Sequence, residues 1–328
     1  MSGSNGSFKR HTEPPILSST VEEVVITPAD FAMIFKRAEL PLKHDDVTKM
    51  ATTGISNILY GLGNNYVLRV ARNHPNAYAD ARTESVAVPV VTAHNIKTPR
   101  LIAYDDSETI LPVPYTIYER VHGQTLLEYS GDPASRARIY REFGAEIARL
   151  HQQVTTCPDP KGFLDRPYRI DAMQLIEALT ESGYLSTDNR QWLTTVFKRL
   201  LPAVEEASSF RRFLHDDAHM GNIMVTNDAF GWLLDWGDAG WGDPAMEFTY
   251  TPSRAIPYVL EGYRSIMLMD GDDTAEARIL WDHLARALAR LKRDPVPQRS
   301  MWSDRPGAPL VELLAAISTV KEWQQYLS

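Results

Sequence analysis

Two aspartates, two histidines and an asparagine stand within the polar segment 215–222, between short apolar runs on either side. A further apolar run at 232–236 carries another carboxylate, Asp235. Apolar runs of this length, rich in Leu, Ile, Val and Trp, predict buried strands, so we expect the polar residues to form a loop between paired strands. Carboxylate and amide oxygens gathered in this way could bind Mg²⁺ and, with it, a phosphorylated ligand.

The spacing of Asp217, Asn222 and Asp235 matches what phosphoryl transfer to a hydroxyl requires. That reaction needs a carboxylate near the attacking hydroxyl, oxygen ligands for Mg²⁺, and cations on the phosphates. An Asp-x₄-Asn loop followed by an Asp at the end of a strand is the protein-kinase pattern for these groups. In this interpretation Asp217 accepts or orients the hydroxyl proton, while Asn222 and Asp235 hold the metal.

The order of predicted elements divides the chain into two parts. Short apolar and alternating segments between 47 and 121 predict strands, with a helix over 79–94 among them. After Asp132, apolar residues recur at steps of three and four, which predicts helices, among them 255–269, 274–291 and 309–327. We therefore expect an α+β, bilobal protein with a polar tail (1–20), a strand-rich N-lobe (21–121) and a mainly helical C-lobe (122–328).

Composition and charge exclude several classes of protein. The 328 residues include 42 acidic and 34 basic side chains, a net charge of −8 that disfavours nucleic acid as a partner. The single cysteine, Cys157, excludes an intramolecular disulfide and fits a reducing compartment. No apolar run approaches the ~18 residues of a membrane span, and the N-terminus lacks a signal-peptide core. We expect a cytoplasmic protein that does not bind membranes.

Three motifs occur in order and at suitable spacing: H-D-D-A-H-M-G-N at 215–222, L-D-W at 234–236 and G-D-P at 242–244. Together they resemble the aminoglycoside phosphotransferase family, whose pattern is roughly H-G-D-L-H-P-G-N, then I-D-W, then G-D-P. Upstream, G-I-S-N at 54–57 is similar to the family's nucleotide loop, and Y-V-L-R-V at 66–70 to one of its strands. The family is a branch of the protein-kinase-like fold that also contains choline, fructosamine and homoserine kinases.

This resemblance implies a role for each matched residue. It implies a small antiparallel-sheet N-lobe that binds a nucleotide and a larger helical C-lobe that carries the catalytic loop and the substrate site. The implied nucleotide-binding residues are Gly54 and Ser56, whose backbone approaches the phosphates, Arg69 on the α- and β-phosphates, Glu84, which orients Arg69, Tyr118 at the back of the base pocket, and Glu119 and Val121, whose backbone groups meet the base.

The donor implied by the resemblance is ATP or GTP, with Mg²⁺. In that family a bulky aromatic residue at the gate position accompanies use of guanine nucleotides, whereas a smaller residue admits adenine. Tyr118 is such an aromatic residue, so we expect GTP to be used as well as, or instead of, ATP. The alternative is that Tyr118 is a half-buried strand residue without influence on the base.

The sequence departs from the family pattern at three positions near the loop. Asp216 replaces the usual Gly, which adds a second carboxylate that either turns to solvent or raises the pKa of Asp217. Met220 replaces Pro, and Glu247 stands where the family often has Asp. None of these changes removes a group that the chemistry requires.

The other polar residues of the motifs have simpler explanations. His215 and His219 could ligate a metal, but such sites need further His and Asp residues on helices, so we expect both to support the loop through hydrogen bonds. Asp243, between a Gly and a Pro, is expected to cap a turn rather than to bind a ligand.

The prediction is therefore an enzyme, a small-molecule O-phosphotransferase that works as a monomer or a homodimer. The expected acceptor is a hydroxyl of an antibiotic, either an aminoglycoside or another sugar-bearing or nucleoside compound. One alternative is a metabolite kinase of the choline, fructosamine or homoserine kinase type. The alternative from another class is a nucleotide-binding pseudokinase-like module, which loss of Asp217, Asn222 or Asp235 would have favoured; all three are present.

Overall fold

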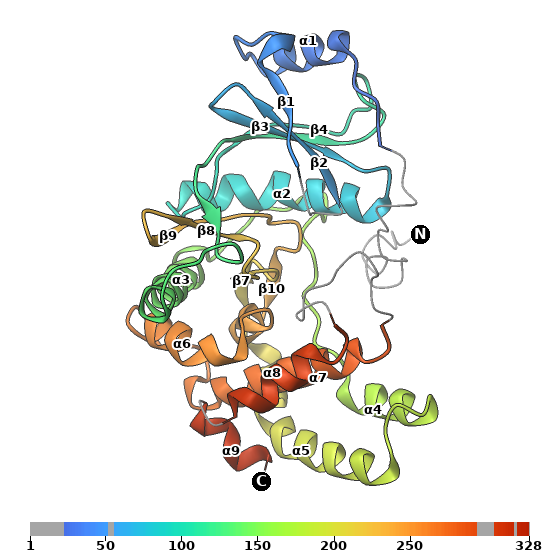
Figure 1. Ribbon diagram of the computed structural model, residues 1–328, viewed down its shortest axis with the longest axis vertical. Helices are drawn as coiled ribbons and strands as arrows, with labels where there is room; N and C mark the ends of the chain where they lie inside the picture. Colours follow the sequence, from blue (N-terminus) through green and yellow to red (C-terminus); the bar gives the residue numbers. More distant parts are fainter. Residues whose placement is uncertain (1–22, 52–55, 294–304, 318–319, 328) are drawn as a thin grey trace.

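The chain folds into a small sheet-containing lobe and a larger helical lobe (Figure 1). A computed structural model describes residues 23–51, 56–293, 305–317 and 320–327. The expected α+β, bilobal architecture is confirmed. The predicted tail, 1–20, lies outside the described residues, and the lobe limits 21–121 and 122–328 stay predictions.

An antiparallel five-stranded sheet forms the N-lobe, in the order β1-β2-β3-β5-β4. Its strands are β1 (Val47–Lys49), β2 (Asn57–Leu62), β3 (Tyr66–Ala71), β4 (Leu101–Asp105) and β5 (Tyr115–Glu119). Successive side chains of a strand point to opposite faces. Leu68 and Val70 of β3 are fully buried in the core that includes Phe31 of helix α1 (Pro28–Arg37). Arg69 therefore points to the other face, the side of the sheet on which α2 lies (Figure 1).

Helix α2 (Pro75–Ala93) crosses the molecule between the sheet and the C-lobe (Figure 1). It begins earlier than the predicted residue 79, because His74 caps it through its ring nitrogen and Pro75 occupies the first turn. Glu84, in the middle of this helix, is buried. The position of α2 thus brings a carboxylate from the N-lobe to the boundary with the C-lobe.

The C-lobe is built mainly from helices. These are α3 (Pro133–Gln153), α4 (Ala172–Glu181), α5 (Thr187–Glu206), α6 (Ile256–Arg264), α7 (Ala275–Arg290), α8 (Ala308–Ala316) and α9 (Lys321–Leu327). Helices α3 and α6 cross at backbone distance, because a Cβ on Gly144 would lie 2.0 Å from the Val259 carbonyl oxygen and one on Gly262 1.9 Å from that of Arg141. Only glycine permits so close an approach at these two positions.

Two predicted helix limits are wrong. The predicted helix 309–327 is divided into α8 and α9, and α6 ends at Arg264 instead of continuing to 269. Ile317 and Val320, the described residues between these two helices, are β-branched and therefore favour a helix less. Among the described residues, no helix combines the length and the apolar character needed to cross a bilayer.

The strands on either side of segment 215–222 do not pair with each other, contrary to our expectation. Strand β7 (Arg212–Leu214) pairs with β10 (Gly240–Gly242), whereas β8 (Ile223–Thr226) lies between β6 (Gln124–Thr125) and β9 (Ala229–Leu233). The loop therefore connects two separate small sheets and is not the tip of a hairpin. Periodicity predicts strands but not their partners, and here each strand pairs with a segment outside the motif.

A buried histidine ties α7 to the segment after β10. The His283 ring nitrogens bond to the Ser253 hydroxyl and the Phe248 carbonyl, both at 2.9 Å. Since the carbonyl only accepts, the neutral tautomer carries its proton on Nε2. Burial lowers the pKa of His283 to about 4.

This burial makes stability depend on pH. The unfolded histidine binds a proton below about pH 6.5, so the folded state loses roughly 3 kcal/mol as pH falls from 6.5 towards 4. Thermal unfolding across this range should show a shallower loss of stability for His283→Gln, which keeps a donor and an acceptor without titrating. The same change at the exposed His44 should leave the wild-type slope, and equal slopes for all three proteins would contradict this assignment.

Candidate active site

The loop 215–222, called here the catalytic loop, is anchored from behind by His215. The His215 backbone N–H donates to Glu247 Oε2 at 2.8 Å, and its Nε2 donates to the Leu234 carbonyl at 2.8 Å. Its Nδ1 accepts the backbone N–H of Asp217 at 3.3 Å. Both His215 and Glu247 are fully buried. His215 is therefore a support of the loop and has no ring nitrogen left for a metal.

Asp217 and Asn222 lie together at the front of the loop. The Asn222 amide nitrogen donates to the backbone carbonyl of Asp217 at 3.0 Å and to its carboxylate at 3.1 Å. This orientation leaves the amide oxygen of Asn222 for another partner. His219 accepts the Gly221 N–H at 2.9 Å, and its Nε2 lies 3.6 Å from the Asp217 carboxylate. The front of the loop thus gathers a carboxylate, an amide oxygen and a histidine.

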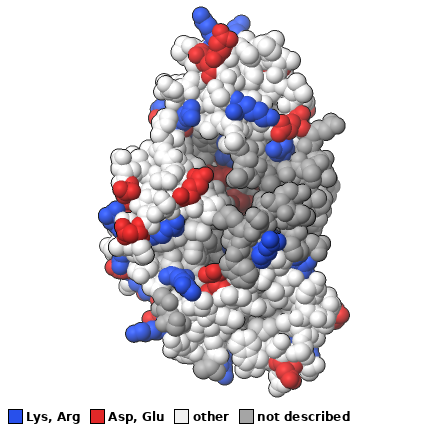
Figure 2. All heavy atoms as spheres, viewed as in Figure 1, with Lys and Arg blue, Asp and Glu red and all other residues white. Residues whose placement is uncertain are grey.

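Arg69 connects this loop region to the N-lobe. Its guanidinium donates to Glu84 of α2 at 2.5 Å and to Asp235, which follows β9, at 2.9 Å. It also lies over the Tyr118 ring, 5.7 Å from the centroid. Residues from the sheet, α2 and the C-lobe, separated by up to 166 positions, therefore meet at one cation. Figure 2 shows acidic and basic atoms in the hollow between the lobes.

Arg69 and the carboxylates around it shift one another's pKa values. Desolvation raises the pKa of Glu84 to about 7, although the Arg69 guanidinium opposes the rise. Desolvation would also raise the pKa of Asp235, but here the same guanidinium outweighs it and holds the pKa below its usual value. Asp235 is therefore an anion in the absence of ligands, with Arg69 as its counterion.

Asp217 experiences the opposite effect. Desolvation, followed by the charges of Asp238 and Asp235, raises the pKa of Asp217 well above its usual range. Asp216 is not among the largest contributors to this shift, although the charge of Asp217 raises the pKa of Asp216. The pKa of Asp216 itself is raised by desolvation and then by Glu247 and Asp238. A cation bound among these crowded carboxylates would stabilise their ionised forms.

Two aspartates of the site hold left-handed backbone conformations. Asp216 has φ 62° and Asp235 φ 67°. Among residues with a side chain, Asp and Asn enter this region most readily. The conformation also explains why glycine is the usual residue of the family pattern at the position of Asp216.

The donor set fits Mg²⁺. Mg²⁺ is usually held by one or two protein oxygens and completes its shell with water and substrate phosphates. The Asn222 amide oxygen and the Asp235 carboxylate supply two such atoms. In the part of the chain that the structure describes, no cluster of three or more His, Cys, Asp or Glu side chains forms a ready-made metal cage. The magnesium site would therefore be completed only when the nucleotide phosphates bind.

Of the other predicted nucleotide-binding residues, Ser56, Glu119 and Val121 lie within the described part of the chain. The Glu119 N–H already bonds to the Arg100 carbonyl at 2.9 Å, while the backbone N–H and carbonyl of Val121 have no partner among the described residues. The Ser56 carbonyl accepts the Arg72 N–H at 2.9 Å. Gly54 lies outside the described residues.

Sequence reasoning missed two charged residues beside the catalytic loop. Asp238 acts on both Asp216 and Asp217, and Arg286, on α7, counters the charge of Asp217. Asp238 stands three residues after Asp235, so its proximity to the motif was visible in the sequence. Arg286 belongs to a row of arginines at helical spacing, but only the fold shows which side of α7 faces the loop.

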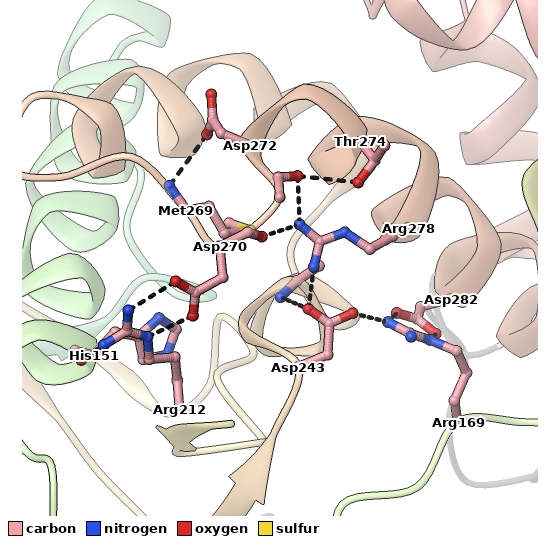
Figure 3. Close-up of polar contacts among 12 residues, drawn as sticks. His151, Arg169, Arg212, Asp243, Met269, Asp270, Asp272, Thr274, Arg278 and Asp282 are labelled. Carbon is pink, nitrogen blue, oxygen red and sulfur yellow. Dashed lines mark hydrogen bonds and ion pairs between the residues drawn. The ribbon is translucent and has the colours of Figure 1, made fainter. Parts of the chain in front are cut away.

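Behind the site, Asp243 is the centre of a buried ion network (Figure 3). It caps the turn Pro244–Phe248 by accepting the Ala245 N–H at 3.0 Å, and it pairs with both Arg278 and Arg169. Arg169 continues to Asp282 at 2.8 Å. Asp243 therefore has a structural role, in agreement with the expected cap, and holds α7 against the segment that follows the catalytic loop.

Removing the Asp243 carboxylate should destabilise the protein strongly. In Asp243→Asn the fully buried Arg278 loses its counterion, which typically costs about 3–5 kcal/mol. Chemical denaturation should show this loss. The exposed pair Arg190–Glu177 provides the control, since Arg190→Gln should cost less than about 1 kcal/mol. Equal effects of the two changes would show that the network contributes little.

Comparisons with known proteins agree with this geometry. The model of the phosphotransferase enzyme family matches residues 52–259, and no curated protein sequence matches the chain. Among solved structures, aminoglycoside phosphotransferase APH(2'')-Ib with ADP is 12% identical and covers 90% of this chain and 98% of its own (TM-score 0.58). APH(2'')-IIIa with GDP and kanamycin is 14% identical and covers 91% and 99% (TM-score 0.55).

A choline/ethanolamine kinase family protein from Mesorhizobium loti is also similar, with 16% identity, coverage of 92% and 98% and a TM-score of 0.58. At these identities the structures establish the shared fold, whereas the family match covers more than half of the chain. Together with the catalytic-loop geometry, these findings show that the chain belongs to the phosphotransferase enzyme family and has its kinase-like fold.

Proposed function

We propose that this enzyme transfers the γ-phosphoryl group of ATP or GTP to a hydroxyl of a small molecule, with Mg²⁺. The observation that carries the proposal is the meeting of Arg69, Glu84 and Asp235 beside the Asp217–Asn222 pair. Phosphoryl transfer depends on positioning and charge stabilisation, and these are the groups it requires. Structures similar to this one that hold ADP or GDP support a nucleoside triphosphate as the donor.

Arg69 is assigned to the donor phosphates. Without ligands it is the counterion of Asp235, and a bound triphosphate offers it stronger oxyanion partners. Glu84 keeps the guanidinium in place during this exchange, because their 2.5 Å contact is buried. Asn222 and Asp235 would hold Mg²⁺, which neutralises charge on the phosphate oxygens when bound.

Asp217 is assigned to the acceptor hydroxyl. The hydroxyl oxygen forms a bond to the γ-phosphorus, the bond from that phosphorus to the bridging oxygen breaks, and the nucleoside diphosphate leaves with that oxygen. The hydroxyl proton passes to the Asp217 carboxylate, which acts as the general base. The amide of Asn222 fixes the carboxylate in position.

The proposed acceptor is an antibiotic, either an aminoglycoside or another sugar-bearing or nucleoside compound, so that phosphorylation inactivates it. The similar structure with kanamycin supports an antibiotic, and the choline/ethanolamine kinase family protein supports the alternative of a metabolite kinase. A pseudokinase-like module is disfavoured, because Asp217, Asn222 and Asp235 are present and lie in one cleft.

Loss of the Asp217 carboxylate should separate binding from chemistry. Asp217→Ala should lower kcat by about 10²–10⁴-fold, the usual contribution of a positioned base. Nucleotide affinity, measured by calorimetry, should stay within a few fold of wild type. Turnover near the wild-type rate would refute the assignment of the base, and a wild-type protein that binds nucleotide but consumes none with a broad acceptor panel would favour the pseudokinase-like module.

Tyr118 provides a test of the donor. If its ring favours guanine at the back of the base pocket, GTP should bind more tightly than ATP, and Tyr118→Ala should shift the preference towards ATP. Calorimetric titration of both nucleotides into both proteins measures this ratio. Because Tyr118 also lies against Arg69, a fall in affinity for both nucleotides would report a damaged phosphate site instead. Equal affinities of the wild type for ATP and GTP would remove the donor hypothesis.

A further inference from the structure

A cavity of about 250 Å³ lies beside the catalytic loop and is lined by both acidic and basic side chains. The acidic side chains are Asp165, Asp216, Asp238 and Asp282, of which Asp282 is paired with Arg169. The basic side chains are Arg286, Arg290 and Arg293. This volume is at or below the lower end of ligand pockets, about 300 Å³. It therefore suits a small acceptor, or one end of a larger one.

The three arginines form a row. Steps of four and three residues place side chains on the same face of a helix, and Arg293 follows the end of α7 with its N–H bonded to the Arg290 carbonyl at 3.0 Å. Like charges at this spacing disfavour a helix by a few tenths of a kcal/mol. Helix stability therefore does not explain why three cations line one cavity.

Arg286 is held in place by contacts that leave its charge unneutralised. Its Nη1 donates to the Thr249 carbonyl at 3.1 Å, and its guanidinium lies 3.5 Å from the centroid of the Tyr250 ring. Within the described part of the chain, no carboxylate forms an ion pair with it. Two other guanidinium groups of this lobe differ, since Arg169 and Arg278 pair directly with Asp243.

The electrostatics of Arg286 agree with this geometry. Burial lowers its pKa to about 10, and the nearby charges of Arg290 and Arg293 act in the same direction. The charge of Asp217 opposes this effect, so Arg286 lies within electrostatic reach of the proposed base. An anion held between Arg286 and Arg293 would relieve the repulsion between these two charges.

We propose that the arginine row is an acceptor subsite for an oxyanion, so that the acceptor carries a carboxylate or phosphate group in addition to its hydroxyl. This inference rests on the proposed phosphotransferase function and narrows its substrate class. Guanidinium groups bind planar oxyanions in a bidentate manner, and Tyr250 holds one of them ready. The hydroxyl end of the acceptor faces Asp217.

The first test is nucleotide consumption with matched acceptors: D-glucose, D-glucuronate and glucose 6-phosphate, the corresponding forms of other sugars and nucleosides, and kanamycin. Acceptors with an oxyanion should have kcat/KM at least about tenfold above their neutral counterparts. Arg286→Gln and the exposed Arg293→Gln should each raise KM for them by about tenfold, with a smaller effect on kcat. Arg286→Lys, which keeps the charge, should recover part of the loss.

Lys292→Gln is the matched control, because Lys292 is exposed between Arg290 and Arg293 and does not line the cavity. It should leave KM unchanged. The inference would be overturned if the wild type, Arg286→Gln and Arg293→Gln turned over neutral or cationic acceptors with the same KM. The phosphotransferase function would remain intact in that case. The carboxylate and phosphate arms of the panel distinguish the two kinds of oxyanion.

If no acceptor is phosphorylated, that result counts against the proposed function. A binding measurement then tests the oxyanion subsite by itself. D-glucuronate and D-glucose are titrated into protein saturated with Mg²⁺ and a non-hydrolysable nucleotide. Tighter binding of D-glucuronate that weakens in Arg286→Gln and Arg293→Gln but not in Lys292→Gln supports the oxyanion subsite. Equal binding of the two sugars, or binding that the arginine variants do not change, overturns it.

Discussion

The guanidinium of Arg69 is the contact on which the arrangement of the cleft depends. It is largely buried and lies between a carboxylate of the N-lobe helix α2 and one that follows strand β9 of the C-lobe. A buried cation with one partner removed costs several kcal/mol, so both partners are needed to keep it there. The same charge that holds the lobes in register also keeps Asp235 ionised and therefore able to accept a metal.

The catalytic loop is held from behind rather than by its own strands. Its neighbours β7 and β8 belong to different sheets, so the loop conformation depends on His215, whose ring and backbone bond to Leu234, Asp217 and Glu247. Beyond these, the network around Asp243 fixes α7 against the same segment. At the front of the loop, Asp217 lies close enough to Asp235 and Asp238 for their charges to raise its pKa.

Much of this could be predicted from the sequence, because it follows from short-range patterns. The α+β class follows from periodicity, and the family from the three motifs around Asp217, Asn222 and Asp235. The pairing of β7 and β8 was predicted wrongly, since a strand pattern carries no information on which partner it finds. Arg286 was missed for a related reason. Helical spacing shows that the arginines share one face of α7, but not which part of the protein lies against that face. The contact of Arg69 with Glu84 was expected only through the resemblance. Its contact with Asp235, 166 positions away, was not predicted.

The left-handed backbone of Asp216 has a consequence for how this protein can evolve. A residue with a side chain in that conformation carries about 1 kcal/mol of strain that glycine does not, and aspartate and glycine codons differ by a single nucleotide. One point mutation could therefore relax the backbone and remove a carboxylate from the wall of the cavity, without rebuilding the loop. Aspartate at this position therefore carries a small cost in stability that a single change to glycine would remove.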